Sequence, residues 1–320
     1  MTPSALHCPV CGDPRAAICA RSCPENLGLT GQRYSYAHCP GCGIISLVPP
    51  PHPSQLHHYY QLLDQRQDRW WHSPAGQQLW ARLQQPPSRL KGVLRWLASG
   101  GEQPYPFWRW LRPGSILDLG AGTGEFCLEA RRRGWTVCGV EQSASSIALA
   151  AQRGLALVED SLSSERTLSL VATAHNVVLL HVFEHVVQPR ELLTALRQRM
   201  RPGARLILVL PNPRSLWRYL FRQRWYGWDP PIHVHHYSAP ALRSLLQQEG
   251  FRVLELRSLR RHQSLAVALG QLGWCRSPWQ AALPLLLLLL PLMPLLAVAG
   301  LAPELLCVAE INGGPGDAGT

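Results

Sequence analysis

Between residues 115 and 311, short runs rich in β-branched and aliphatic residues alternate with longer spacers of helical character. Seven runs are predicted to be strands, at 115–119, 136–141, 156–159, 176–180, 205–210, 252–258 and 305–311. This alternation is typical of a mostly parallel sheet with helices on both faces, because each parallel crossover needs a long connection. The sequence therefore predicts an α/β fold with a Rossmann-like, doubly wound, seven-stranded sheet. No internal repeat is visible in the sequence.

A glycine-rich turn follows the first predicted strand. Residues 116–126 read ILDLGAGTGEF, so that Gly120, Gly122 and Gly124 stand where the strand passes into a helix. Ligands of doubly wound sheets bind beyond the carboxyl ends of the strands, and glycine allows them to approach the backbone closely. A dinucleotide loop would place its third glycine at position 125, which is Glu125 in this chain. The turn therefore predicts a nucleotide-type ligand that is not a dinucleotide.

Two carboxylates near the turn point to the cofactor. Asp118 precedes the loop, where a carboxylate disfavours a pyrophosphate but suits a ligand with an ammonium group, such as S-adenosylmethionine. Glu141, at the end of the second predicted strand, is placed to accept hydrogen bonds from ribose hydroxyls, and residues 160–162 would flank the adenine. An ordinary strand-to-helix turn is the alternative interpretation. The residues expected to contact the cofactor are Asp118, Gly120, Ala121, Gly122, Gly124, Glu141, Gln142, Asp160, Ser161 and His181.

The amino-terminal part of the chain contains two CPxCG sequences, at 8–12 and 39–43. Each tight turn directs two thiolates to one point, and two such turns supply the four sulfur ligands of tetrahedral zinc. We expect a structural zinc ion bound by Cys8, Cys11, Cys39 and Cys42, which would stabilise a module too short to build a core. Four neighbouring residues could substitute as ligands, but they lack this doubled spacing and are expected to be loop residues, namely His7, Cys19, Cys23 and His38. Metal spacing also favours a reducing cytoplasm, and no signal-peptide pattern is expected.

These motifs together resemble the class I S-adenosylmethionine-dependent methyltransferases, in particular those with an amino-terminal zinc-binding module, a layout shared with deoxysugar C-methyltransferases. The matching segments are the two CPxCG turns, ILDLGAGTGEF, VCGVEQS, LLHVFEHVVQP, LILVLPNP and RWYGWDPPIHVHHYS. The resemblance covers most of the chain and implies methyl transfer to a small molecule. Members commonly begin the fourth strand with Phe-Asp, whereas this chain has His175-Asn176. This departure leaves the cofactor loop unaffected.

The chain of 320 residues, 46% of them apolar, can build one main domain with appendages. A zinc-binding module is expected at 1–48, followed by a proline-marked linker and cap helices at 49–112. The methyltransferase domain is expected at 113–262 and 303–312. An apolar insertion at 263–302 separates its last strand from the rest.

Three histidines are candidates for catalysis. Methyl transfer is an in-line displacement, so a base is needed only when the nucleophile must lose a proton. His181 and His185 flank Glu184 after the fourth strand, and His233 lies on a loop that the resemblance places over the substrate. His185 could instead orient its loop, and the cluster at 233–236 shows no carboxylate partner for a second metal. The end of the fourth strand lacks the Asn/Asp-Pro-Pro-aromatic motif of amine-directed enzymes, which favours an oxygen or carbon acceptor.

The apolar insertion suggests contact with a membrane. Residues 277–303 carry no charge, and this segment is long enough for a helix to cross a hydrocarbon layer. It includes the uninterrupted leucine run Leu285–Leu290. Prolines interrupt the segment, and both ends must lie on one side of the membrane if the seventh strand joins the sheet. We expect a re-entrant or interfacial hairpin, with a buried subdomain or dimer face as the alternative. A basic helix over 213–228, with Arg214, Arg218 and Arg222 four apart, is predicted to be interfacial or a substrate lid.

The net charge of +11 is almost entirely arginine, because Lys91 is the only lysine. It predicts either a solvated arginine surface or attraction to an anionic partner. Nucleic acid is disfavoured because the basic residues are scattered, although an RNA methyltransferase remains one alternative and a non-catalytic membrane-docked scaffold another. The leading hypothesis is methyl transfer to a small, glycan-type or lipid-linked acceptor by a cytoplasmic protein at the inner face of a membrane. The oligomeric state stays open.

Overall fold

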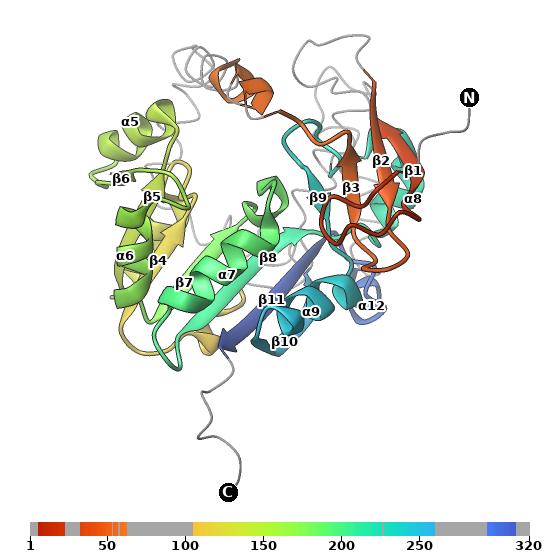
Figure 1. Cartoon of the computed structure of the whole chain (residues 1–320). Helices are drawn as coiled ribbons and strands as arrows, with labels where there is room; N and C mark the ends of the chain where they lie inside the picture. Colours follow the sequence, from red (N-terminus) through yellow and green to blue (C-terminus); the bar gives the residue numbers. More distant parts are fainter. Residues whose placement is uncertain are drawn as a thin grey trace, which may run out of the picture.

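The computed structural model describes residues 6–22, 33–52, 54–56, 58–62, 105–225, 227–259 and 293–311. These residues form two sheets, one with seven strands and one with four (Figure 1). The predicted linker is therefore described only in part, and most of the predicted apolar insertion lies outside the described residues. Among the helices in the described ranges, none is long and apolar enough to cross a membrane.

The seven-stranded sheet has the order β10-β11-β8-β7-β4-β5-β6. Its strands are β4 (Ser115–Leu119), β5 (Thr136–Glu141), β6 (Val158–Glu159), β7 (Asn176–Leu180), β8 (Arg205–Pro211), β10 (Phe251–Leu259) and β11 (Glu304–Ile311). Neighbours from β8 to β6 are parallel, and β11 pairs antiparallel with both β8 and β10. The predicted doubly wound sheet and its seven strands are confirmed, with bounds that differ by two residues at most.

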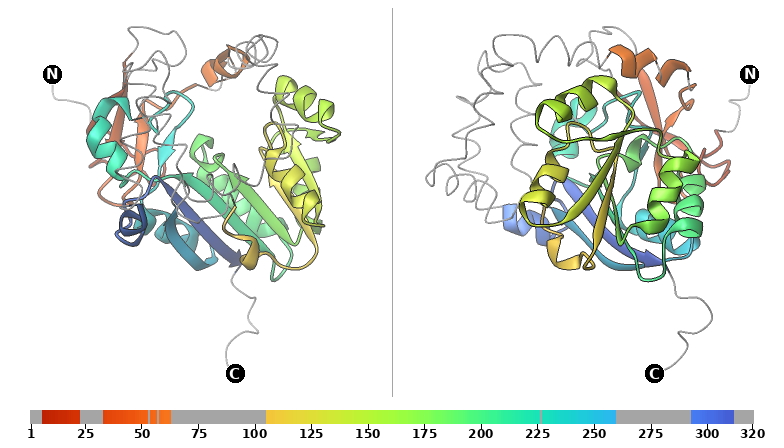
Figure 2. Two further views of the ribbon diagram at one scale, coloured as in Figure 1. Left: turned by 180° about the vertical axis from the view of Figure 1, so that it is seen from behind. Right: turned by 90° about the vertical axis from the view of Figure 1, so that its left-hand side faces the viewer.

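Helices cover both faces of this sheet (Figure 2). They are α4 (Glu125–Arg132), α5 (Ala144–Gln152), α6 (Glu165–Thr173), α7 (Pro189–Arg199) and α9 (Ala239–Gln248), with η2 (Trp108–Trp110) and η3 (Phe183–His185) as short 3-10 turns. Serine side chains cap α5, α6 and α9 by accepting a backbone N–H three residues on, and proline opens α7 and α9. Such capping serines and prolines mark the residue at which a strand-to-helix loop ends and the helix begins.

The alternation of side chains along the strands divides the core into two layers. Val177 and Leu179 of β7 pack with leucines of α7 and α9 on one face, whereas Val178 packs with Phe126 of α4 on the other. Successive residues of a strand point to opposite faces, so an uninterrupted apolar strand is buried on both sides. This packing holds the carboxyl ends of β4, β5 and β7 at one edge of the sheet.

The four-stranded sheet joins the amino-terminal segment to a much later part of the chain. Strands β1 (Ala17–Ser22), β2 (Tyr34–His38) and β3 (Ile45–Val48) form an antiparallel meander, and β3 then pairs with β9 (His235–His236). Behind this sheet, a cluster of buried aromatic residues includes Tyr36, Trp217, Trp225 and Trp228. The predicted amino-terminal module is thus completed by residues that follow the fourth helix of the large sheet.

The predicted basic helix over 213–228 is wrong in its extent. Helix α8 covers only Leu216–Phe221, followed by the short 3-10 turn η4 (Arg222–Arg224). Arg222 has a positive φ of 48°, which ends the α-helix because the left-handed conformation cannot continue it. Three tryptophans of this segment, Trp217, Trp225 and Trp228, are buried in the cluster behind the small sheet.

Candidate functional site

The glycine turn between β4 and α4 has one open position. Gly120, Gly122 and Gly124 all have positive φ, at 75°, 53° and 76°. A Cβ atom at Gly120 would lie 2.5 Å from Val182, and one at Gly124 would lie 2.1 Å from Leu155. At Gly122 it would meet nothing within 4 Å. Packing therefore requires two of the glycines, whereas the third leaves free space above the turn that a ligand can occupy.

Glu141 ties this turn to the next strand. Its Oε2 accepts a hydrogen bond from the backbone N–H of Gly122 at 2.7 Å, and its Oε1 accepts from the N–H groups of Gln142 and Ser143 at 2.8 and 2.9 Å. The carboxylate is thus held in one orientation by three backbone donors. It retains acceptor capacity, since an ionised carboxylate has about four lone-pair positions.

Asp160 lies beside Glu141 at the same edge of the sheet. Its backbone N–H donates to the Glu141 carbonyl at 3.0 Å, and its carboxylate accepts from the Ser161 N–H at 2.8 Å and the Ser164 hydroxyl at 2.5 Å. The Ser164 hydrogen bond lowers the pKa of this carboxyl, which therefore stays ionised. The structure thus brings the predicted cofactor residues of β4, β5 and β6 to one edge.

Asp118 is buried beneath the turn rather than exposed above it. The residue is 2% exposed, its Oδ2 accepts the Cys127 S–H at 3.3 Å, and its Oδ1 has no hydrogen-bond partner in the described part of the chain. Burial raises the pKa of the Asp118 carboxyl to about 7. An uncompensated buried carboxylate favours a cation bound nearby, because both interact through a medium of low dielectric constant.

Replacing Asp118 by asparagine is expected to stabilise the protein without ligand and to weaken its binding of a cationic cofactor. The folded pKa lies above the unfolded value, so the aspartate costs stability as pH rises from about 4 to about 7. The difference in free energy of unfolding between the D118N variant and the unaltered protein should be on the order of 2–4 kcal/mol more favourable to the variant above pH 7 than at pH 4. Denaturant unfolding at both pH values measures this. The prediction would be contradicted by an equal effect of D118N on the free energy of unfolding at the two pH values. It would also be contradicted by the same pH-dependent stabilisation in the exposed control Glu165→Gln.

His181 ends β7 in a strained conformation and sits between two acids. It has a φ of 56°, and its ring nitrogens lie 3.5 Å from a Glu184 oxygen and 3.3 Å from a Glu304 oxygen. Burial lowers the pKa of His181, but Glu304 and Glu184 outweigh it and raise the pKa to about 9. The ring is therefore an imidazolium at neutral pH and has no lone pair with which to accept a proton.

His185 and His233 come together from separate parts of the chain. Their ring centroids are 4.9 Å apart and the rings are tilted by 32°. The Tyr60 hydroxyl lies 3.4 Å from His185 Nδ1, and His233 Nδ1 lies 2.7 Å from the Gly227 carbonyl oxygen. His185 Nε2 has no partner among the described residues. Burial and the neighbouring His233 lower the pKa of His185 to about 3, so this ring is neutral and offers a free nitrogen.

Glu184 lies next to both histidines, although no carboxylate partner for His233 was expected from the sequence. One carboxylate oxygen of Glu184 and a nitrogen of each of the two histidines all lie within 4.8 Å of one another. The Val234 N–H donates to the Glu184 carbonyl at 2.9 Å, which holds the two segments together. This group could bind an acceptor's polar atoms or hold a metal ion. The adjacent Glu184 and His185 could be recognised in the sequence as a candidate site. No feature of the neighbouring residues indicated that His233 would lie beside them.

The other two histidines of the 233–236 cluster are structural. His235 is buried in β9, with Nδ1 2.9 Å from the Ser46 hydroxyl and Nε2 3.1 Å from the Val187 carbonyl. His236 is buried among the rings of Tyr36, Trp225 and Trp228. They connect the small sheet to the loop that carries His233, called the histidine loop below, and do not face the site.

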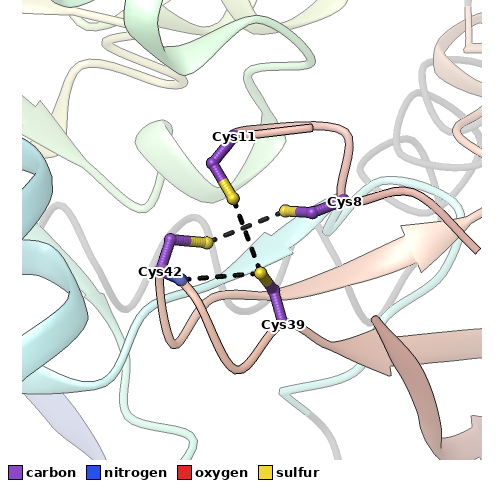
Figure 3. A group of neighbouring side chains, drawn as sticks. All are labelled: Cys8, Cys11, Cys39 and Cys42. Carbon is purple, nitrogen blue, oxygen red and sulfur yellow. Dashed lines mark hydrogen bonds between the residues drawn. The ribbon is translucent and has the colours of Figure 1, made fainter. Parts of the chain in front are cut away.

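The four cysteines of the CPxCG turns gather at one point (Figure 3). Cys8 and Cys42 have sulfur atoms 3.7 Å apart, and Cys11 and Cys39 have theirs 3.5 Å apart. All four are free thiols, and two backbone N–H groups donate to Cys8 and Cys39 sulfur at 3.4 and 3.5 Å. Four convergent sulfurs with N–H···S support fit tetrahedral zinc.

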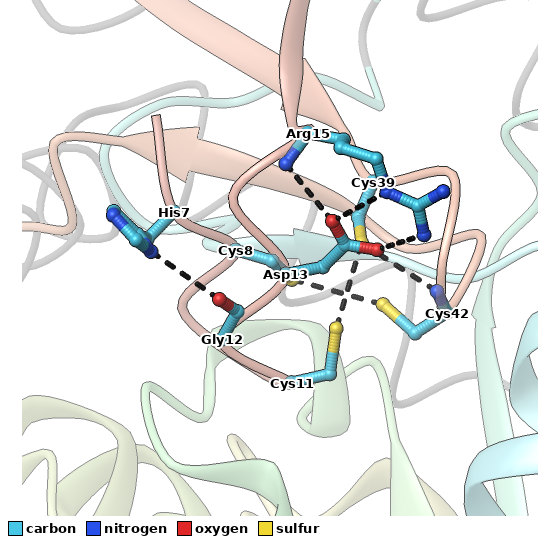
Figure 4. Close-up of polar contacts among 8 residues, drawn as sticks. All are labelled: His7, Cys8, Cys11, Gly12, Asp13, Arg15, Cys39 and Cys42. Atoms are coloured by element: carbon cyan, nitrogen blue, oxygen red, sulfur yellow. Dashed lines mark hydrogen bonds and ion pairs between the residues drawn. The ribbon is translucent and has the colours of Figure 1, made fainter. Parts of the chain in front are cut away.

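The other residues near this cluster do not join it. His7 Nδ1 lies 3.3 Å from the Gly12 carbonyl, and Asp13 pairs with Arg15 rather than with the thiols (Figure 4). Cys19 lies on β1 and His38 ends β2, whereas Cys23 is outside the described residues. The candidate ligand set is therefore the four cysteines alone.

Comparisons with known proteins agree with the geometry. Residues 103–256, which include the strands from β4 to most of β10, match a family model described as a methyltransferase domain. A search of curated proteins finds no match. Neither result establishes the narrower resemblance to deoxysugar C-methyltransferases.

Solved structures with a similar chain include three methyltransferases. An S-adenosylmethionine-dependent methyltransferase from Thermotoga maritima is 15% identical, covering 79% of this chain and 98% of its own, with a TM-score of 0.47. Geranyl diphosphate C-methyltransferase from Streptomyces coelicolor is 14% identical, covering 62% and 71%, with a TM-score of 0.43. Phosphoethanolamine N-methyltransferase 2 from Haemonchus contortus is 16% identical, covering 62% and 49%, with a TM-score of 0.42. Similarity at this level says nothing about the acceptor.

Proposed function

We propose that this chain, whose residues 103–256 form a class I methyltransferase domain, transfers a methyl group from S-adenosylmethionine to oxygen or carbon of a small, glycan-type or lipid-linked acceptor. The observation that carries the proposal is the open space above Gly122, next to the carboxylate of Glu141 at the end of β5 and close to Asp160, which follows β6. The cofactor's sulfonium would supply the methyl group.

The residues around the turn have the chemistry that this cofactor requires. Glu141, oriented by three backbone donors, would accept hydrogen bonds from the ribose hydroxyls. Asp160 and Ser161 would flank the adenine, and Gln142 would contact the cofactor at the same edge of the sheet. The buried Asp118 would favour the cationic methionine end through its electric field. His181, at the end of β7, would border the methionine end of the cofactor.

The acceptor is proposed to enter on the side of His185 and His233. His185 is neutral and has a free ring nitrogen, so it can take a proton from an acceptor hydroxyl or an acidic C–H. Glu184 lies behind both rings, where its negative charge would stabilise the imidazolium that forms. His233 is held by the Gly227 carbonyl and would orient the acceptor.

Replacing His185 by alanine is expected to lower kcat by about 10²–10⁴-fold, the usual contribution of a general base. The affinity for S-adenosylmethionine should stay within roughly twofold, because the histidine contacts the acceptor and not the cofactor. Single-turnover kinetics and calorimetric titration measure the two quantities. His52→Ala, on an exposed loop, serves as control. An unchanged kcat would assign His185 to orienting the loop.

Two further parts of the proposal concern the setting of the enzyme. The four clustered cysteines would bind a structural zinc ion, and the uncharged segment 277–303 supports a lipid-linked acceptor reached by a cytoplasmic protein at the inner face of a membrane. The amino-terminal module at 1–48, the linker at 49–112, the catalytic domain at 113–262 and 303–312, and the insertion at 263–302 remain the proposed division of the chain.

Methyl transfer can be tested without knowing the acceptor. The full-length protein is incubated with methyl-labelled S-adenosylmethionine and a cell extract, which is then separated into small-molecule, lipid, protein and RNA fractions. Label in a sugar or lipid, with a mass gain of one methylene unit, supports the proposal. Label in RNA would instead support an RNA methyltransferase. Cofactor binding without transfer to any fraction would support a non-catalytic scaffold.

A further inference from the structure

Large apolar side chains are exposed at one end of the molecule. Among the described residues, five of them are markedly exposed: Ile18 at 47%, Tyr219 at 57%, Leu220 at 58%, Leu295 at 65% and Val298 at 90%. Two belong to α8 and two to α12 (Met293–Val298), and Ile18 belongs to β1, which packs against η4. Figure 1 shows α8 and α12 on the side of the molecule that carries the small sheet.

The start of α8 is hydrogen-bonded to the segment that follows α12. The Leu216 N–H donates to the Leu301 carbonyl at 2.9 Å, and the Asn212 side chain donates to the Gly300 and Ala302 carbonyls at 2.9 and 2.7 Å. Leu296 of α12 packs against the same buried cluster as Trp217 of α8. Both helices therefore pack against one buried cluster, and each has apolar side chains exposed outside it.

The exposed apolar side chains follow helical spacing. Leu295 and Val298 are three residues apart on α12, on the side away from the partly buried Leu296. On α8, Tyr219 and Leu220 point outward whereas Trp217 is 2% exposed. Each helix therefore has apolar side chains on two sides, one of which packs inside the protein and one of which does not.

The charge around these side chains has a single sign. Arg214 and Arg222 are exposed beside the apolar residues, and Arg218 is partly exposed between them. Neither 213–225 nor 293–303 contains an aspartate or glutamate. The adjoining segment 277–292 is also uncharged. This face therefore combines unpaired apolar area with positive charge.

We propose that this face docks the protein on an anionic phospholipid bilayer. The α8–α12 surface is defined by Arg214, Tyr219, Leu220, Arg222, Leu295 and Val298. Leucine and valine would enter the acyl boundary, tyrosine would lie at the headgroup level, and the arginines would pair with lipid phosphates. The inference rests on the membrane setting of the proposed function and deepens it by naming the docking surface and the lipid charge; vesicle binding is measured separately from methyl transfer, so the two can fail separately.

A bilayer suits this surface better than two other occupants. In a symmetric dimer the same patch faces itself, so the arginines of both copies would meet with like charge. The uncharged segment 277–292 could cover the apolar side chains but would leave the arginines without an anionic partner. Only an anionic lipid surface satisfies both the apolar and the cationic residues.

Flotation of the full-length protein with lipid vesicles tests the proposal. The protein should bind vesicles of phosphatidylcholine mixed with phosphatidylglycerol, bind phosphatidylcholine alone more weakly, and lose affinity as salt is raised. Arg214→Gln with Arg222→Gln should weaken binding by roughly thirtyfold. Leu220→Glu with Val298→Glu should weaken it by roughly tenfold or more.

Matched variants on α4 and α6, two helices that cover the large sheet, control for charge and folding. Arg132→Gln with Arg166→Gln removes two exposed arginines of α4 and α6, and Ser169→Glu with Ala172→Glu adds two acids to the exposed face of α6. Both should bind vesicles like the unaltered protein, and light scattering and thermal unfolding are followed for every variant. Absence of vesicle binding at low salt, equal losses in the control variants, or binding that survives Leu220→Glu with Val298→Glu would overturn the proposal. So would a surface variant that only turns a dimer into a monomer.

Discussion

Gly122→Arg is expected to abolish the binding of S-adenosylmethionine while the protein keeps its fold. An added side chain at Gly122 meets no protein atom within 4 Å, so it would enter the space above the turn that the cofactor is proposed to occupy. The positive φ of 53° adds a strain of about 1–2 kcal/mol, which a domain of this size can tolerate. Calorimetric titration should detect no binding, and thermal unfolding should remain cooperative.

Gly203→Arg is the matched control for this experiment. Gly203 also has a positive φ, of 76°, and no atom within 4 Å of an added Cβ, but it lies between α7 and β8, away from the carboxyl ends of the strands. It therefore carries the same strain and the same new charge and should bind the cofactor normally. Normal binding by Gly122→Arg would show that the cofactor site is elsewhere.

Removing the proposed zinc ion is expected to stop methyl transfer while cofactor binding persists. The free energy of zinc binding to such sites is about 10–16 kcal/mol, so the amino-terminal module should lose its structure without the metal. That module holds the histidine loop. The Tyr36 hydroxyl donates to the Trp228 and His233 carbonyls at 2.7 and 3.0 Å, and the Leu47 N–H donates to the Val234 carbonyl at 2.8 Å. His233 would therefore lose its position, whereas the glycine turn belongs to the other sheet.

Cys39→Ser and chelation are the two ways to make this test. Elemental analysis should find about one zinc per chain before treatment and none after it. Cys19→Ser is the control, because Cys19 lies in the same module but outside the cluster. Loss of cofactor binding along with activity would mean that the whole protein unfolds as one unit. Full activity without metal would show that the cluster does not support the site.

The fold of the large sheet could be predicted because its strands are apolar on both faces. Val177 and Leu179 pack on one side of β7 and Val178 packs on the other. A strand buried by helices on both faces is therefore recognisable in the sequence as a run of consecutive apolar residues. The glycine turn was equally predictable, since positive φ at three close positions needs glycine. Such features are local, and their physical causes act within a few residues.

The candidate acceptor site could be predicted only in part. His185 and His233 were recognised individually, but Glu184 as a neighbour of His233, and Glu304 as a partner of His181, depend on contacts between distant segments. The length of α8 was overestimated because the helical spacing of the arginines includes Arg222, whose positive φ ends the helix. Helical periodicity does not report where tertiary packing ends a helix.

The sequence by itself determined the doubly wound sheet, the glycine turn and the two cysteine pairs, because each follows from steric or chemical requirements of adjacent residues. Only the tertiary structure decided that β9 joins the amino-terminal sheet and that the histidine loop is held by that sheet. It also decided that Asp118 lies beneath its turn and that α8 and α12 expose a common apolar face. Burial and contact between segments far apart in the chain are properties of the packed molecule and have no local signature.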